Sequence, residues 1–212
     1  MPFSPLKFLL FLLAVAVLIG FIQVGLISIA FDKLGLSPES AYLLLVCTLV
    51  GSMINLPLLH LKADRSVPMR GPPGHPPFTG KIRVVANVGG AVVPAAFSIY
   101  LMTHNQLNPV QIVLAIALVA IIARGFSRPI PGIGIGLPLL ITPIAAALVA
   151  TILDPQQRAP LAYIDGTLGV LIGADLIRLK DISRLGSPIA SIGGAGTFDG
   201  VFLTGLIAVL LA

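Results

Sequence analysis

The sequence predicts an all-α integral membrane protein. Of its 212 residues, 57% are hydrophobic and only 10% are charged, and the mean hydropathy is +1.04. A soluble domain of this length keeps roughly a quarter of its residues charged. The 13 Lys and Arg residues stand in short clusters between long apolar runs, a pattern typical of topology control in a bilayer. We therefore expect the lipid bilayer as a partner and no nucleic acid.

Seven apolar runs approach the roughly 20 residues that a helix needs to cross a bilayer. The first has no small-residue cleavage pattern before Asp32, which favours a retained helix over a signal peptide. The fourth and seventh are short. The predicted spans are Leu6–Phe31, Ser40–His60, Val84–Thr103, Pro109–Ala123, Gly136–Leu153, Pro160–Ile177 and Phe198–Ala212. Together they make one polytopic membrane domain over residues 1–212, with an irregular Pro/Gly-rich loop at 61–80.

The basic residues orient these spans. With the N-terminus inside, the outer side holds only Lys33 and Arg158, and all other Lys and Arg residues lie on the inner side. Cytoplasmic loops carry an excess of Lys and Arg. The sequence therefore predicts a multi-pass protein of the inner (plasma) membrane with its N-terminus inside and its C-terminus outside. The loop at 61–80 is then cytoplasmic.

Polar or helix-breaking motifs collect on the cytoplasmic side of this topology. They are Asn55, Asn87, the segment Arg128–Pro138, Asp175 and Asp199. Irregular backbone at membrane depth is tolerated where it is buried in protein or lines a wet cavity. The five motifs predict one polar site that opens to the cytoplasm. The alternative is that each motif simply ends a helix at the membrane boundary.

The sixth span carries a stripe of small residues. Gly166, Gly169 and Gly173 fall within about 60° of each other around a helix with 100° per residue. Small residues allow transmembrane helices to approach closely. We expect a neighbouring helix there, or a second copy of the chain that forms a homo-oligomer through Gly169 and Gly173.

Two carboxylates at facing ends of consecutive antiparallel helices suggest one chemistry. Asp175 ends the sixth span and Asp199 begins the seventh. If the two side chains meet, one holds a proton and the pair can act in general acid–base hydrolysis. In this hypothesis Asp175 and Asp199 are catalytic. The alternative is that each caps a helix or pairs with Arg178, Lys180 or Arg184.

A transporter or ion-binding protein is the hypothesis of a different class. Glycines before the seventh span would expose backbone groups, and oxygen atoms of several side chains would bind a cation or protons. The substrate- or ion-binding residues predicted in this way are Asn55, Asn87, Gly194, Gly196 and Thr197, beside Asp175 and Asp199. Asp165, with Thr142 and Pro143, would serve access from the outer side.

The remaining features indicate no metal site and no cofactor. His60, His75 and His104 lack metal-ligand spacing. The segment Gly132-Ile-Gly-Ile-Gly136 lies between membrane helices rather than after a strand, so it does not indicate nucleotide binding.

Two resemblances add to this interpretation. Tyr163-Ile-Asp165, Gly173-Ala-Asp175 and Gly-Ala-Gly-Thr-Phe-Asp199-Gly resemble motifs of presenilin-like intramembrane aspartyl proteases, although two residues stand between the glycine and Asp199. That resemblance covers about forty residues and implies catalysis by Asp175 and Asp199.

A second resemblance spans most of the chain. Gly-Ser-Met-Ile-Asn55-Leu-Pro, Asn87-Val-Gly-Gly, Arg128-Pro-Ile-Pro-Gly, Gly-Ala-Asp175-Leu and Gly-Thr-Phe-Asp199-Gly-Val-Phe resemble bacterial and archaeal membrane proteins of domain of unknown function 1614. This resemblance implies a membrane location and no particular activity.

Overall fold

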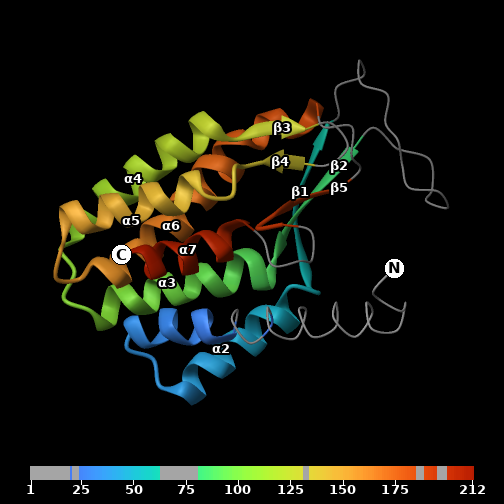
Figure 1. The fold of residues 1–212 in the computed structure, drawn as a ribbon. Coiled ribbons are helices and arrows are strands. Elements are labelled where there is room, and N and C mark those ends of the chain that lie inside the picture. Colours follow the sequence, from blue (N-terminus) through green and yellow to red (C-terminus); the bar gives the residue numbers. More distant parts are fainter. Residues whose placement is uncertain (1–19, 21–23, 63–80, 131–133, 185–188, 195–199) are drawn as a thin grey trace, which may run out of the picture.

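Apolar helices lie side by side in a bundle, and a small β-sheet lies at one end of it (Figure 1). The computed structural model describes residues 20, 24–62, 81–130, 134–184, 189–194 and 200–212. The helices are Val24–Lys33, α2 (Pro38–Gly51), α3 (Val93–His104), α4 (Pro109–Phe126), α5 (Ile141–Leu153), α6 (Arg158–Val170) and α7 (Gly200–Leu211). Every predicted span therefore contains a helix.

Local sequence explains where several helices begin. Ser37 accepts a hydrogen bond from the amide of Ser40 and caps α2, and Asn108 accepts one from Val110 and caps α4. A proline follows each cap at the start of the helix, where its missing N–H costs nothing.

The outer faces of α4 and α5 expose large apolar side chains: Val110, Val113, Ile121, Leu148 and Ile152. Such faces suit contact with lipid rather than water.

The lengths of the helices give fewer complete spans than the sequence predicts. Within the part of the chain that the structure describes, two helices, Pro109–Phe126 and Arg158–Ser183, are long and apolar enough to cross a membrane alone. The pair Val24–Lys33 and Pro38–Gly51 passes the same criterion together, with a bend of 117°. Shorter apolar helices cover Val88–His104, Ile141–Leu153 and Val201–Leu211.

The prediction that the chain is all-α is wrong, because several predicted spans change from helix to strand at one end. A three-stranded sheet has the order β1–β2–β5, with β1 (Asn55–Lys62) antiparallel and β5 (Ile189–Ile192) parallel to the central β2 (Lys81–Asn87). The predicted second span continues through Asn55–His60, yet α2 ends at Gly51. Pro57 cannot stay inside a helix, and the register of β1 shifts beside it.

The predicted third span is interrupted in the same way. Its first residues belong to β2, where Ile82 and Val84 are buried while Lys81 and Arg83 are exposed. This alternation is the pattern of a strand, not of a helix. A π-helical turn, Val88–Val92, then leads into α3. A second, two-stranded sheet pairs β3 (Arg128–Ile130) with β4 (Gly134–Gly136) before α5.

Helix α6 lies at the centre of the bundle. It contacts α3, α4, α5 and α7, and ten of its 13 residues are buried. It continues through a π-helical segment, Leu171–Leu176, into a 3-10 helix, Ile177–Arg184. This irregular continuation carries the chain from the bundle toward the sheet.

Two glycines of the stripe, Gly169 in α6 and Gly173 in its π-helical continuation, face α4 of the same chain. A Cβ atom on Gly169 would lie 2.7 Å from the Val119 side chain, and one on Gly173 would collide with the backbone carbonyl of Ala120. The neighbouring helix expected at this stripe is therefore α4. A homo-oligomer that uses Gly169 and Gly173 would have to displace α4, and the oligomeric state stays a prediction.

Adding one methyl group at this contact should destabilise the bundle. Gly173→Ala forces α6 away from the α4 backbone, and we expect the free energy of unfolding to fall by about 1–3 kcal/mol. Gly125→Ala in α4 is the matched control, because a Cβ there meets no atom within 4 Å. Thermal unfolding of the purified protein in detergent measures both. Equal midpoints for the two variants would contradict this packing.

Candidate functional site

Asn55 and Asn87, two of the predicted site residues, meet at the junction of sheet and helices. Asn55 is the first residue of β1, Asn87 is the last of β2, and the two pair in the antiparallel register. The side-chain amide of Asn87 donates to Asn55 Oδ1 at 3.1 Å and to the carbonyl of Ser52 at 2.6 Å. Its Oδ1 accepts the N–H of Gly90 at 2.8 Å. Asn87 is fully buried, so these bonds fix strand β2, α2 and the π-helical turn together.

Asp175 and Gly194 join this junction from the other side. The backbone N–H of Gly193 donates to Asp175 Oδ2 at 2.9 Å. The hydroxyl of Ser191 donates to Asn55 Oδ1 at 3.3 Å and contacts the carbonyl of Gly194. The structure thus brings four predicted residues to one junction, which we call the asparagine junction: Asn55, Asn87, Asp175 and Gly194.

Glycine is needed where the two halves of the asparagine junction touch. Gly193 and Gly194 have φ angles of +74° and +84°, which side chains with a Cβ atom rarely adopt. A Cβ atom on Gly90 would collide with the carbonyl oxygen of Gly193. The Asn-Val-Gly-Gly and Ile-Gly-Gly motifs therefore serve a close contact between two backbones.

The other predicted site residues lie outside the described residues. These are Gly196, Thr197 and Asp199. The predicted acid pair of Asp175 and Asp199 therefore stays a prediction. Of the segment Arg128–Pro138, the described residues include the β3 and β4 strands. Among the described residues, no group of three or more His, Cys, Asp or Glu side chains is placed to hold a metal ion.

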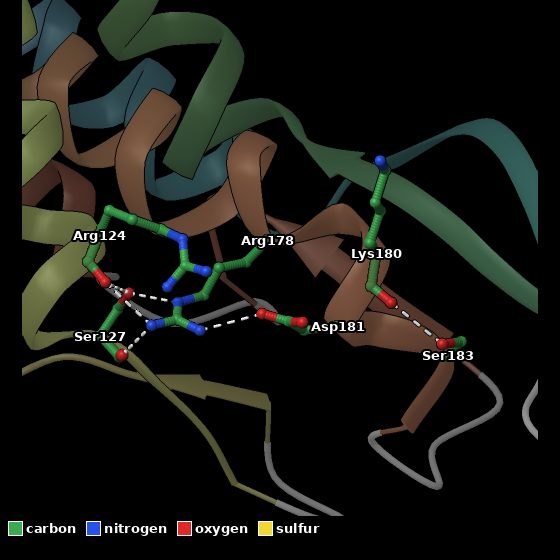
Figure 2. A network of polar contacts seen from close by, with 6 residues as sticks. All are labelled: Arg124, Ser127, Arg178, Lys180, Asp181 and Ser183. Carbon is green, nitrogen blue, oxygen red and sulfur yellow. Dashed lines mark hydrogen bonds and ion pairs between the residues drawn. The ribbon is translucent and has the colours of Figure 1, made fainter.

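A buried arginine forms a polar network that sequence reasoning did not identify as a site. Arg178 Nε donates to Ser127 Oγ at 2.6 Å, and Nη2 donates to the carbonyl of Arg124 at 2.9 Å and to that of Ser127 (Figure 2). Nη1 forms an ion pair with Asp181 at 2.9 Å. Arg178 is only 8% exposed. It satisfies the carbonyl groups at the C-terminal end of α4, where a cation is also favoured by the helix dipole.

The sequence shows only an arginine beside a predicted membrane span. Such an arginine is equally expected from the excess of basic residues in cytoplasmic loops, so it does not indicate a network. Arg178 and Asp181 are three residues apart, so their pairing on one face of a helix is predictable. Their contact with Ser127 spans 51 residues of sequence and is not predictable from spacing.

Asp165 has the most unusual environment of the described carboxylates. It lies in the regular part of α6, its side chain is 0% exposed, and neither oxygen has a hydrogen-bond partner among the described residues. The hydroxyl groups of Tyr163 and Thr167 on the same helix are also buried and unpartnered there. Buried polar groups without partners are rare and costly, and an intramembrane ionisable group indicates function by default.

Thr142, expected with Asp165 and Pro143 to serve access from the outer side, lies at the start of α5, and this role stays a prediction. Thr142 lies in the first turn of α5, close after the β3–β4 hairpin, and its hydroxyl is 3.5 Å from that of Thr204 in α7. Pro143 is buried beside it in the same turn. Both residues therefore belong to the end of the bundle that carries the sheets.

The Arg178 network should stabilise the protein measurably. Arg178→Ala removes the donors for two buried carbonyl groups and one hydroxyl, so we expect the free energy of unfolding to fall by about 3 kcal/mol. Arg124→Ala is the matched control, because the network uses only the backbone carbonyl of that residue. Thermal unfolding in detergent compares the two. A loss no larger for Arg178→Ala than for Arg124→Ala would contradict this role.

Comparisons with known proteins place the chain in a family. The family model "Protein of unknown function (DUF1614)" matches residues 49–211, from the end of α2 through α7. No curated protein and no solved structure matches the chain. The presenilin-like resemblance therefore receives no support. Because the family model covers most of the sequence, including the asparagine junction and Asp165, the chain belongs to the DUF1614 family of membrane proteins.

Proposed function

We propose that the protein is a cation- or proton-coupled transporter in which Asp165 binds the ion. The observation that carries this proposal is the complete burial of Asp165, with both carboxylate oxygens unpartnered among the described residues. An isolated negative charge in such a place is strongly unfavourable, and binding a cation or a proton removes it. A structural carboxylate would have a donor or a basic partner instead.

The asparagine junction supports the same proposal, because it would form the cytoplasmic end of the ion site. Asp175 lies ten residues after Asp165 along α6 and its continuation, about 15 Å at 1.5 Å per residue. Between them the helix changes to π-helical geometry over Leu171–Leu176, and such irregular turns frequently accompany functional sites. Asn55, Asn87 and Asp175 then lie where an ion would enter from the cytoplasm.

Hydrolysis by Asp175 and Asp199 is the first function that the sequence predicts, with transport as its alternative, and no observation on the described residues favours hydrolysis over transport. One oxygen of Asp175 accepts the Gly193 N–H. A hydrolase mechanism needs a water-accessible pair of carboxyl groups, of which Asp199 lies outside the described residues.

The proposed topology has seven spans in the inner (plasma) membrane, with the N-terminus inside. The distribution of basic residues over the two ends of the bundle supports it. Lys33 and Arg158, the two predicted outer cations, line one pocket. The described basic residues of the predicted inner side belong to the sheets or to the helix ends beside them: Lys62, Lys81, Arg83, Arg124, Arg128, Arg178, Lys180 and Arg184.

Neutralising Asp165 should abolish ion movement. In vesicles that contain the purified protein, a potassium diffusion potential should drive uptake of protons, read by an entrapped pH dye, or of radioactive sodium. We expect Asp165→Asn to reduce uptake to the level of protein-free vesicles, because the variant lacks the carboxylate that binds the ion. Asp32→Asn is the matched control, since Asp32 is exposed outside the bundle core.

Two outcomes would contradict transport. One is wild-type uptake equal to that of protein-free vesicles, and the other is full uptake by Asp165→Asn. If the wild type instead cleaves a reporter membrane helix and Asp175→Asn does not, hydrolysis replaces transport as the function.

Single cysteines test the topology. The natural Cys47 is first replaced by Ser, and cysteines are then introduced in the 61–80 loop at His75 and between α5 and α6 at Gln156. In intact cells, a membrane-impermeant maleimide should label His75→Cys only after the membrane is opened, and Gln156→Cys without opening. Labelling of both in intact cells would contradict the proposed orientation.

A further inference from the structure

We propose that the ion bound at Asp165 is a proton rather than a metal cation. This inference rests on the proposed function and names the ion that the site carries. The surroundings of Asp165 provide few ligands for a metal cation and enough for a proton.

A metal cation at this position would lack ligands. Hard cations in proteins take about six oxygen ligands, from carboxylates, hydroxyls, backbone carbonyls or water. Asp165 lies in the regular helix Arg158–Val170, where each backbone carbonyl accepts a hydrogen bond from the helix itself. The irregular backbone that frees carbonyls for cations begins only at Leu171.

The two nearby hydroxyl groups point elsewhere. Tyr163 and Thr167 are each two residues from Asp165, which is about 200° around a helix with 100° per residue. Both lie against α7, since a Cβ atom on Gly205 would be 2.5 Å from Thr167 Oγ1 and 3.2 Å from the Tyr163 ring. They therefore cannot complete a coordination shell around the Asp165 carboxylate.

Among the described residues, no basic side chain forms an ion pair with Asp165 either. The four helices α3, α4, α5 and α7 that contact α6 contain one arginine, one histidine and one tyrosine: Arg124 on α4, and His104 and Tyr100 on α3. Arg124 lies in the last turn of α4, beside Arg178, which is 13 residues after Asp165 and about 20 Å along the helix. The His104 ring is exposed, stacks on Tyr100 and contacts the Tyr100 carbonyl. Helices α5 and α7 carry no charged side chain.

A proton is the one cation that a single carboxylate binds without further ligands. An O–H bond forms on one Asp165 oxygen, no bond in the protein breaks, and the negative charge disappears. The proton comes from water on one side of the membrane and leaves to water on the other. The carboxyl group is thus neutral while it is buried and ionised only when water reaches it.

Infrared difference spectroscopy of the full protein in lipid vesicles tests the proposal at neutral pH. A protonated carboxyl group gives a C=O stretching band distinct from the bands of a carboxylate. We expect this band in the wild type, equal in sodium chloride and choline chloride, shifted in heavy water and absent in Asp165→Asn. Asp165→Glu keeps a carboxyl group, so its band should persist at a changed frequency even if the Asn variant fails to fold.

The opposite result would identify a metal cation. The proposal that Asp165 binds a proton is overturned if the spectrum shows no protonated band and a carboxylate band of Asp165 changes when sodium replaces choline. In that case sodium-driven uptake dependent on Asp165 would still uphold transport. Conversely, a protonated Asp165 in a protein that moves no ion keeps the proton assignment and removes the transport function.

Discussion

The close approach of α6 to α4 is the constraint on which the rest of the structure depends. Lipid offers no hydrophobic drive for helices to associate, so packing contacts must hold them together. Gly169 and Gly173 let the α6 backbone reach Val119 and Ala120 without an intervening side chain. Gly166 does the same toward α5 and α7, where its nearest neighbours are Ala146, Ala208 and Gly205. Small residues therefore place α6 in the centre, with other helices on several sides.

The central position of α6 determines how its two aspartates behave. A helix that is covered on most faces can expose polar side chains only at its ends, and everything between them is isolated from water. Asp175 lies at the end of this helix, in the π-helical segment, where it accepts a hydrogen bond from the Gly193 N–H. Asp165 lies within the covered part, where the neighbouring helices contribute apolar residues. The same packing that stabilises the bundle thus creates a buried carboxylate without a hydrogen-bond partner among the described residues.

The sequence predicts the helices well and the sheets poorly. Long apolar runs identify each described α-helix, because a membrane helix needs a long apolar stretch. Parts of strands β1 and β2 fall in predicted spans because hydropathy does not distinguish an apolar strand from a helix. Pro57 and the alternation from Lys81 to Val84 contained the missing signal. For the site, the polar motifs include four residues that meet at the asparagine junction, whereas pairings such as Arg178 with Ser127 depend on three-dimensional contacts that spacing does not encode.

The asparagine junction is held rigidly by hydrogen bonds, whereas Asp165 is placed to bind and release an ion. At the junction each donor and acceptor of Asn87 is satisfied, so any movement there would break several hydrogen bonds at once. At Asp165 no such bond holds the side chain among the described residues, and its charge depends on whether an ion is bound. An ion that binds and leaves needs a side chain free of such bonds, like Asp165, in a structure held by rigid contacts, like those of the asparagine junction. The fold supplies both on one continuous helix, because the regular turns of α6 keep Asp165 buried and its π-helical continuation carries Asp175 to the junction.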